Sequence, residues 1–207
     1  MRSLSYDEII TIIIENKDIL NQNNITQIST FIETGTYKGG TIFPLSKQFK
    51  NLYTIEINKT AYSHCLNVAK KKNISNIKFY LGDSSEKMND VVVHLNDNNL
   101  LTSIFFLDGH VTDNNSGFTG KGNKDVPLLE ELKIISDNYK GNGIIIIDDT
   151  RLLNEVRSKN TANADWSDIT IEAILDQFSK KRIIKSYFTY GGGKQKEKND
   201  RYIILFK

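Results

Sequence analysis

The stretch QISTFIETGTYKGGT, residues 27–41, decides the fold. Its first part is rich in β-branched and aromatic residues, which predicts a strand over 27–35. The strand ends in a glycine-containing turn, and the apolar run that follows predicts a helix over 41–49. Pro44 is acceptable in the first turn of that helix, where backbone donors have no intrahelical partner. A strand, a glycine turn and a helix in this order begin a βαβ unit.

The same alternation continues along the chain. We predict strands over 51–58, 77–83, 103–110 and 143–150, and helices over 59–72, 84–96 and 125–139, the last capped by Asp125. The segments SIFFLDGH (103–110) and GIIIIDDT (143–150) are apolar on both faces, as expected of central parallel strands covered by helices on both sides. The sequence therefore predicts an α/β fold with a Rossmann-like, doubly wound sheet.

The two ends of the chain add further helices and a hairpin to this pattern. Ser5 and Glu8 form a capping-box pattern before an apolar run, which predicts a helix over 9–20 within an N-terminal helical extension, 1–25. Near the other end, apolar residues at helical spacing follow Ser167 or Asp168 as the cap. The strands predicted over 182–190 and 200–207 are too close in sequence for a parallel crossover, so they form an antiparallel hairpin. We expect seven strands in a single domain, 1–207.

Composition excludes several classes of function. The 207 residues contain no apolar run of transmembrane length, and the first residues lack the pattern of a signal peptide. The 27 basic and 25 acidic residues give a net charge of +2, whereas a nucleic-acid-binding protein is usually more basic. Cys65 is the single cysteine, which is typical of a reducing compartment. We expect a cytoplasmic protein with no nucleic-acid or membrane partner, and the sequence is compatible with an oligomer.

Candidate nucleotide-binding residues lie where the first three strands end, because open α/β sheets bind ligands beyond these ends. The turn after the first strand is neither G-x-G-x-x-G nor a P-loop, and by itself it is equally compatible with a plain tight turn. Glu56 ends the second strand 21 residues after Gly35, the offset at which an acidic residue accepts ribose hydroxyls. Asp83 and Ser84 follow the third strand, where they could contact a base, cap the next helix, or do both.

Acidic residues and a histidine follow the fourth and fifth strands. Asp108 and His110 end one of these strands, and Asp148 and Asp149 end the other. Three carboxylates in one cleft repel each other unless a cation or a proton lies among them, and Mg²⁺, Mn²⁺ or Ca²⁺ prefers such ligands. The alternative is that one Asp of the pair caps the next helix and no metal binds. His110 is the best candidate for a general base, with Asp108 as the alternative base or as the group that holds the histidine.

Together these motifs resemble the class I S-adenosylmethionine-dependent methyltransferases. The resemblance rests on E-T-G-T-Y-x-G-G (33–40), I-E-I-N (55–58), G-D-S (82–84), F-L-D-G-H (106–110) and the terminal hairpin. It implies that S-adenosylmethionine is the cofactor and that Asp108 lies at the methyl-transfer centre. It places the methionine part along the first turn, the ribose at Glu56 and the adenine at Asp83 and Ser84. The turn residues that it implies are Glu33, Thr34, Gly35, Thr36, Tyr37 and Gly39. Thr36 and Tyr37 depart from the commonest pattern of three alternating glycines.

Two narrower resemblances concern the acceptor. Asp108 with the pair Asp148 and Asp149 is similar to the metal-dependent sugar O-methyltransferases of the macrocin O-methyltransferase type, which implies that these three residues hold Mg²⁺ or another divalent cation. The stretch L-D-G-H-x(n)-G-K-G-x-x-D-x-P-L-L-E-E-L resembles bacterial methyltransferases found with surface-glycan genes, which implies polysaccharide biosynthesis. Four basic residues are candidates for binding a phosphorylated acceptor, or serve only loop solubility: Lys121, Lys124, Arg151 and Arg157.

The resulting hypothesis is a methyltransferase that acts on a small acceptor, at an oxygen of a sugar or of a phosphate-linked glycan precursor. One alternative is a non-catalytic S-adenosylmethionine-binding partner subunit, against which the intact acidic residues and His110 argue. The other is a nicotinamide-dependent Rossmann oxidoreductase. The absence of G-x-G-x-x-G and the C-terminal hairpin argue against that alternative.

Overall fold

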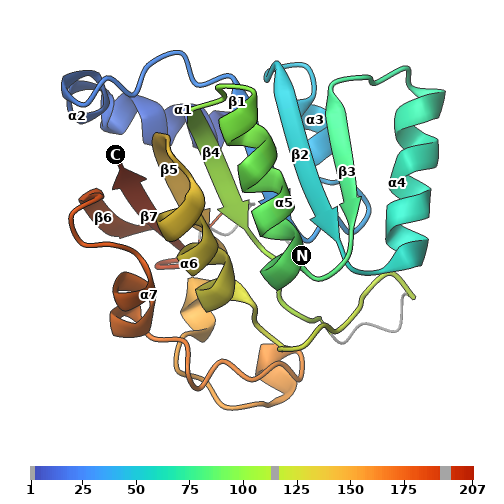
Figure 1. The fold of residues 1–207 in the computed structure, drawn as a ribbon. Helices are drawn as coiled ribbons and strands as arrows, with labels where there is room; N and C mark the ends of the chain where they lie inside the picture. Colours follow the sequence, from blue (N-terminus) through green and yellow to red (C-terminus); the bar gives the residue numbers. More distant parts are fainter. Residues whose placement is uncertain (1–2, 113–116, 192–196) are drawn as a thin grey trace.

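The structure, a computed structural model, describes residues 3–112, 117–191 and 197–207. Its centre is one seven-stranded sheet with the strand order β3-β2-β1-β4-β5-β7-β6 (Figure 1). The strands are β1 (Thr30–Thr34), β2 (Asn51–Glu56), β3 (Ile77–Leu81), β4 (Thr102–Leu107), β5 (Asn142–Ile147), β6 (Ile183–Thr189) and β7 (Arg201–Phe206). All seven predicted strands are confirmed, each a few residues shorter than expected.

Strand directions bring the candidate residues to one edge of the sheet. The first five strands are parallel, and β7 runs antiparallel between β5 and β6. Thr34 at the end of β1 lies opposite both Ile55 of β2 and Leu107 of β4. The residues that follow these three strands are therefore level with one another, as the sequence predicted.

Helices cover both faces of the sheet, which confirms the doubly wound architecture. On one face lie α1 (Tyr6–Glu15), α2 (Lys17–Gln22) and α3 (Ile42–Leu45); on the other lie α5 (Ser84–Asp97), α6 (Leu128–Asn138) and α7 (Ile171–Gln177), while α4 (Lys59–Lys71) packs on β2 and β3 (Figure 1). Two 3₁₀ turns, η1 (Thr150–Leu152) and η2 (Lys159–Thr161), follow β5. Consecutive strand residues enter opposite cores, since Phe31 packs with the first helix group and Ile32 with the second.

Two predicted helices differ from those observed. The helix expected over 9–20 is interrupted at Asn16, whose side-chain amide donates to Ile12 O and to Tyr187 Oη, so α1 ends there and α2 begins. The capping box of Ser5 and Glu8 is present as predicted. The helix expected over 41–49 is the single turn α3, and its N-cap residue Thr41 makes no side-chain cap.

Two predicted caps are wrong. Asp125 does not cap α6, which begins three residues later; its carboxylate instead accepts from Asp165 N and pairs with Lys121 and Arg157. The cap of α7 is Thr170, whose hydroxyl accepts from Ala173 N, rather than a residue at 167 or 168. Tertiary partners of Asp125 thus override its local preference for a helix N-terminus.

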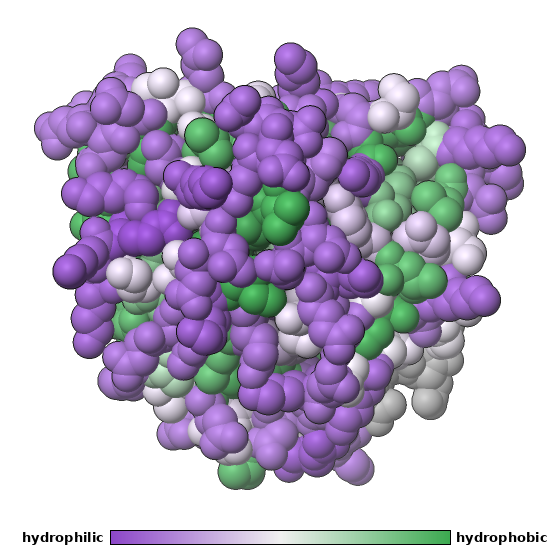
Figure 2. All heavy atoms as spheres, in the orientation of Figure 1, coloured by the Kyte–Doolittle hydropathy of each residue, from purple (hydrophilic) through white to green (hydrophobic). Residues whose placement is uncertain are grey.

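The face of the molecule shown in Figure 2 is mainly polar. Among the described residues, no helix combines the length and apolar character needed to cross a membrane.

Candidate functional site

A cleft with about 550 Å³ of empty space lies beyond the carboxyl ends of the central strands. The predicted site residues that line it are Gly35, Tyr37, Glu56, Asp83, Ser84, Asp108 and His110. These side chains come from four separate segments of sequence, so the sheet brings the predicted nucleotide and acceptor residues to one cleft.

The turn after β1 needs glycine for close approach between strands. Gly35 has a φ of 79°, and a Cβ built there would lie 2.2 Å from Asp108 O. Any side chain at this position would therefore push the β1 and β4 turns apart. Tyr37 also has a positive φ, 49°, and its backbone N–H donates to Glu56 Oε2 at 2.7 Å. The first turn is thus fixed to the end of β2.

Glu56 is 5% exposed and holds two backbone segments together. Besides Tyr37 N, its carboxylate accepts from Asn58 N at 2.8 Å through Oε1. Burial raises the pKa of Glu56, and hydrogen bonds from the backbone oppose that effect. Each carboxylate oxygen has a second lone pair, so the predicted acceptance of ribose hydroxyls remains open to this residue.

Four of the predicted turn residues do not line the cleft: Glu33, Thr34, Thr36 and Gly39. Glu33 is 2% exposed and accepts from the Thr54 hydroxyl at 2.9 Å. Burial raises the pKa of Glu33 to about 8, and the charge of Glu56 adds to the effect. Thr34 accepts from Asp108 N at 3.1 Å. These residues support the cleft wall, and their direct contact with a cofactor stays a prediction.

A loop lies over the end of the cleft at which Asp83 is predicted to contact a base. Asn123 N donates to Asp83 Oδ2 at 2.8 Å, and the Asn58 amide donates to Thr119 O at 2.8 Å. Gly122 allows this approach, since a Cβ there would lie 2.0 Å from Asp83 Oδ2. The other oxygen of Asp83 caps α5 through Ser85 N, as predicted. A nucleobase that donated a hydrogen bond to Asp83 would have to compete with the loop for this carboxylate.

His110 lies between two carboxylates at the acceptor end. Its Nε2 is 3.0 Å from Asp149 Oδ2, and its Nδ1 is 3.4 Å from Asp108 Oδ1. The ring packs against Trp166 at 5.1 Å between centroids. Asp149 has a left-handed backbone, with φ of 55°, which turns its carboxylate back toward the histidine. Strained backbone of this kind is often found at functional sites.

The carboxyl groups around His110 differ in their electrostatic environment. Burial raises the pKa of Asp108 well above its usual range, and the charges of Asp148 and Asp149 raise it further. Burial would also raise the pKa of Asp149, but the hydrogen bond and charge of His110, with Arg151, hold it well below its usual range. At neutral pH Asp149 is therefore the charged partner of His110, whereas Asp108 loses its proton at a higher pH than an ordinary aspartate.

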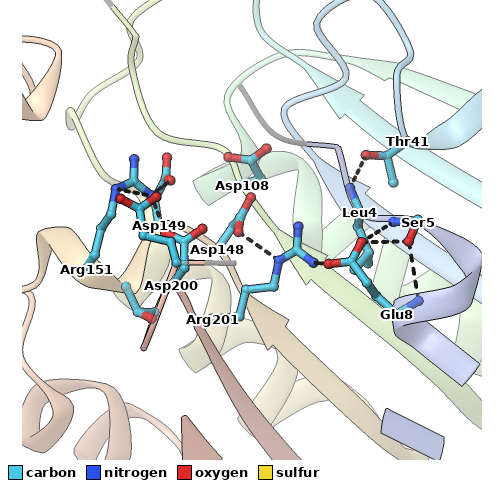
Figure 3. A network of polar contacts seen from close by, with 12 residues as sticks. Leu4, Ser5, Glu8, Thr41, Asp108, Asp148, Asp149, Arg151, Asp200 and Arg201 are labelled. Carbon is cyan, nitrogen blue, oxygen red and sulfur yellow. Dashed lines mark hydrogen bonds and ion pairs between the residues drawn. The ribbon is translucent and has the colours of Figure 1, made fainter. Parts of the chain in front are cut away.

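The three predicted metal ligands do not form one set. Among the residues that the structure describes, the acidic and histidine groups close enough to share an ion are Asp108–His110–Asp149 and Asp148–Asp149–Asp200. Asp148 accepts from Arg201 Nε at 2.9 Å, so a permanent positive charge already contacts one ligand of the expected triad (Figure 3). The triad Asp108, Asp148 and Asp149 therefore does not fit a divalent ion in this arrangement.

The basic residues considered for phosphate binding are each paired within the protein. Lys121 and Arg157 pair with Asp125, and Lys124 pairs with Glu130. Arg151 pairs with Asp149 and Asp200, so it too is engaged. These contacts favour the interpretation of loop anchoring over that of a ready phosphate site.

Two functional candidates were missed by sequence reasoning. Glu131 of α6 is 1% exposed; its Oε2 lies 3.5 Å from Thr34 Oγ1, and burial raises its pKa to about 7. A signal existed, because Glu131 falls on the apolar stripe of α6 with Leu128, Leu132 and Ile135. Arg201 is the second, and no local pattern marks it.

Comparisons with known proteins bear on the fold. No family model and no curated protein matches the chain. Solved structures do match it: an O-methyltransferase from Bacillus cereus in complex with SAH has a TM-score of 0.56 at 13% identity, over 99% of this chain and 82% of that one. An S-adenosylmethionine-dependent methyltransferase from Clostridium acetobutylicum has a TM-score of 0.55 at 15% identity, over 99% and 92%. The chain therefore has the Rossmann-like α/β fold seen in these methyltransferases, with the antiparallel C-terminal hairpin.

Proposed function

We propose that this protein is an S-adenosylmethionine-dependent methyltransferase that methylates an oxygen of a small acceptor. The observation that carries the proposal is the placement of His110, held by Asp149 and Asp108, in the same cleft as the Gly35 turn and Glu56. A methyl transfer needs the acceptor lone pair in line with the sulfonium, so a base must lie beside the cofactor end of the cleft. The fold shared with methyltransferases is consistent with this use of the cleft.

The charge of the cleft also supports a cationic cofactor. Burial raises the pKa of three acidic groups in and near it, Glu33, Glu56 and Asp108. A nearby positive charge favours the ionised carboxylate, so binding a cation would relieve this perturbation. S-adenosylmethionine carries a sulfonium, an ammonium and a carboxylate group and is net positive, whereas a nicotinamide dinucleotide brings two phosphate charges of the wrong sign.

The proposed chemistry assigns separate roles to the two carboxylates. Ionised Asp149 accepts a hydrogen bond from Nε2–H, which sets the tautomer of His110 and leaves Nδ1 as the basic atom. Nδ1 takes the proton of the acceptor hydroxyl while that oxygen attacks the methyl carbon and the carbon–sulfur bond breaks. Asp108, on the Nδ1 side, would position the acceptor or serve as the base in place of the histidine.

The acceptor is proposed to be a hydroxyl of a sugar or of a phosphate-linked surface-glycan precursor. Support comes from the resemblance of the segment around 107–132 to methyltransferases found with glycan genes. A cytoplasmic location and a role in polysaccharide biosynthesis belong to the same proposal, as does the expectation of a small-molecule acceptor and no nucleic-acid partner.

Calorimetry with S-adenosylmethionine and with NADH tests the cofactor, and binding of NADH alone would favour the oxidoreductase alternative. For the base, His110→Ala should leave cofactor affinity intact and lower kcat by about 10²–10⁴-fold. The measurement is single-turnover transfer of tritiated methyl groups across a panel of sugar acceptors, followed against pH. Transfer by the variant at the wild-type rate would remove His110 from the role of base. Binding of S-adenosylmethionine with no transfer to any acceptor would favour the non-catalytic partner subunit.

A further inference from the structure

Arg201 is an arginine buried inside the acidic end of the site. It opens β7 and is 1% exposed. Its Nε donates to Asp148 Oδ1 at 2.9 Å, its Nη1 pairs with Glu8 of α1, and its guanidinium stacks over the Phe106 ring at 5.7 Å. Figure 3 shows the guanidinium between the carboxylates of Asp148 and Glu8. The positive charge is thus fixed in place by contacts from three segments of the chain.

The carboxylates of the expected metal triad each face a basic group of the protein. Asp148 faces Arg201, Asp149 faces Arg151, and His110 lies between Asp108 and Asp149. Guanidinium groups stay charged at every pH at which proteins are folded. A divalent ion placed among these carboxylates would lie close to Arg201 and would be repelled by it, strongly so in a buried setting.

One donor group of Arg201 makes no hydrogen bond with the described residues. Nη2 is buried and has no hydrogen-bond partner among residues 3–112, 117–191 and 197–207. In Figure 3 it points to the side of the cluster on which Asp108 lies. A buried N–H without an acceptor is destabilising, so an orphan at this position suggests that a ligand oxygen completes it.

We infer that Arg201 takes the place of a divalent cation in this site: it neutralises Asp148 and offers Nη2 to an oxygen of the bound ligand. In a metal-dependent site an ion does both things, by balancing carboxylates and by presenting an open position. The inference depends on the proposed function in one respect: the bound ligand is taken to be the methyl acceptor or the cofactor. The site then needs no added metal, and removing the arginine should create a metal site that the natural protein does not have.

The test uses Mn²⁺ alone as the probe, with binding followed by electron paramagnetic resonance on the full chain. Arg201→Gln removes the charge and keeps an N–H donor, whereas Arg201→Lys keeps the charge. The matched control is Arg182→Gln, because Arg182 is a partly buried arginine that donates to backbone carbonyls, those of Ser136 and Lys207 among them. We expect Mn²⁺ affinity at least about tenfold higher for Arg201→Gln than for the wild type, Arg201→Lys or Arg182→Gln.

Two outcomes would overturn the inference. One is Mn²⁺ binding by the wild type that matches that of Arg201→Gln. The other is a folded Arg201→Gln variant with no gain in Mn²⁺ affinity. If Arg201→Gln does not fold, the wild type still decides, because a rise in its thermal midpoint with Mn²⁺ that EDTA reverses and that Asp148→Asn abolishes would show that an ion occupies the site beside Arg201. These measurements contain no S-adenosylmethionine, so their failure is distinguishable from failure to bind the cofactor.

Discussion

Replacing Glu33 by glutamine should remove much of the loss of stability that the protein suffers as the pH rises. Burial raises the pKa of Glu33 to about 8 from its ordinary value of 4.5. A carboxyl group whose pKa is raised on folding stabilises the folded state below its unfolded pKa, and this contribution is lost as the pH rises toward the folded pKa. The window for Glu33 therefore runs from about pH 4.5 to about pH 8.

The size of the effect follows from the width of that window. Each pH unit inside it costs about 1.4 kcal/mol, so between pH 6 and pH 8 the Glu33 contribution falls by about 2–3 kcal/mol. Other carboxyl groups whose pKa is raised by burial titrate in the same range, but they are present in the variant as well. The difference in slope between wild type and Glu33→Gln therefore isolates this residue. Glutamine keeps the shape and can still accept the hydrogen bond from Thr54.

Urea unfolding at a series of pH values measures the effect, with the m-value used to check that unfolding stays two-state. The control is Glu155→Gln, since Glu155 is exposed and its replacement should leave the slope unchanged. If the wild type and Glu33→Gln lose stability in parallel between pH 6 and pH 8, Glu33 is not a buried neutral acid and the electrostatic account of the cleft is mistaken.

Four further predictions concern the site. Glu56→Ala should weaken S-adenosylmethionine binding by about 1–3 kcal/mol in calorimetry, because ribose hydroxyls lose a charged acceptor; an unchanged Kd in a folded variant would remove Glu56 from the cofactor site. Gly122→Ala should push the loop away from Asp83, since its Cβ would lie 2.0 Å from Oδ2, and limited proteolysis should then cut the loop faster than in the wild type. Between pH 6 and pH 8 the free energy of unfolding of the wild type should fall by about 1–2 kcal/mol more than that of Glu131→Gln. The reason is that the pKa of Glu131 is raised to about 7, so its ionisation over that range destabilises the fold. In the pH range in which the raised pKa of Asp108 keeps it protonated, S-adenosylmethionine binding should release protons from Asp108, seen as a dependence of the binding heat on buffer ionisation, and S-adenosylhomocysteine, which lacks the sulfonium charge, should release fewer.

The strand ends could be predicted from sequence because two simple regularities locate them. Continuous apolar runs such as GIIIIDDT mark buried parallel strands, and their first polar residues lie at one edge of the sheet. The distance of 21 residues from Gly35 to Glu56 reflects one helix-containing crossover. This spacing alone predicts that Glu56 lies near the first turn, where its carboxylate accepts from Tyr37 N. Both regularities depend on local pattern.

The parts of the site that escaped prediction depend on contacts between distant segments. Arg201 reaches Asp148 because β7 returns antiparallel beside β5, and the hairpin pattern alone does not say which strand it joins. The loop over Asp83 owes its position to backbone donors and to Gly122, which carry no side-chain signal. Asp125 shows the same limit, because distant partners, the Arg157 guanidinium and the backbone N–H of Asp165, override its local preference for a helix N-terminus.

The protonation of Asp108 links the order of binding to the chemistry. With its pKa raised by burial and by neighbouring charges, Asp108 holds its proton to a higher pH than an ordinary aspartate, and its Oδ1 lies 3.4 Å from His110 Nδ1. A protonated Asp108 can donate toward Nδ1 and so occupy the lone pair that the proposed base needs. A sulfonium bound beside Asp108 would favour the carboxylate and drive that proton out to solvent. His110 would then become an active base only when the methyl donor is in place, so the cofactor should bind before the acceptor is deprotonated.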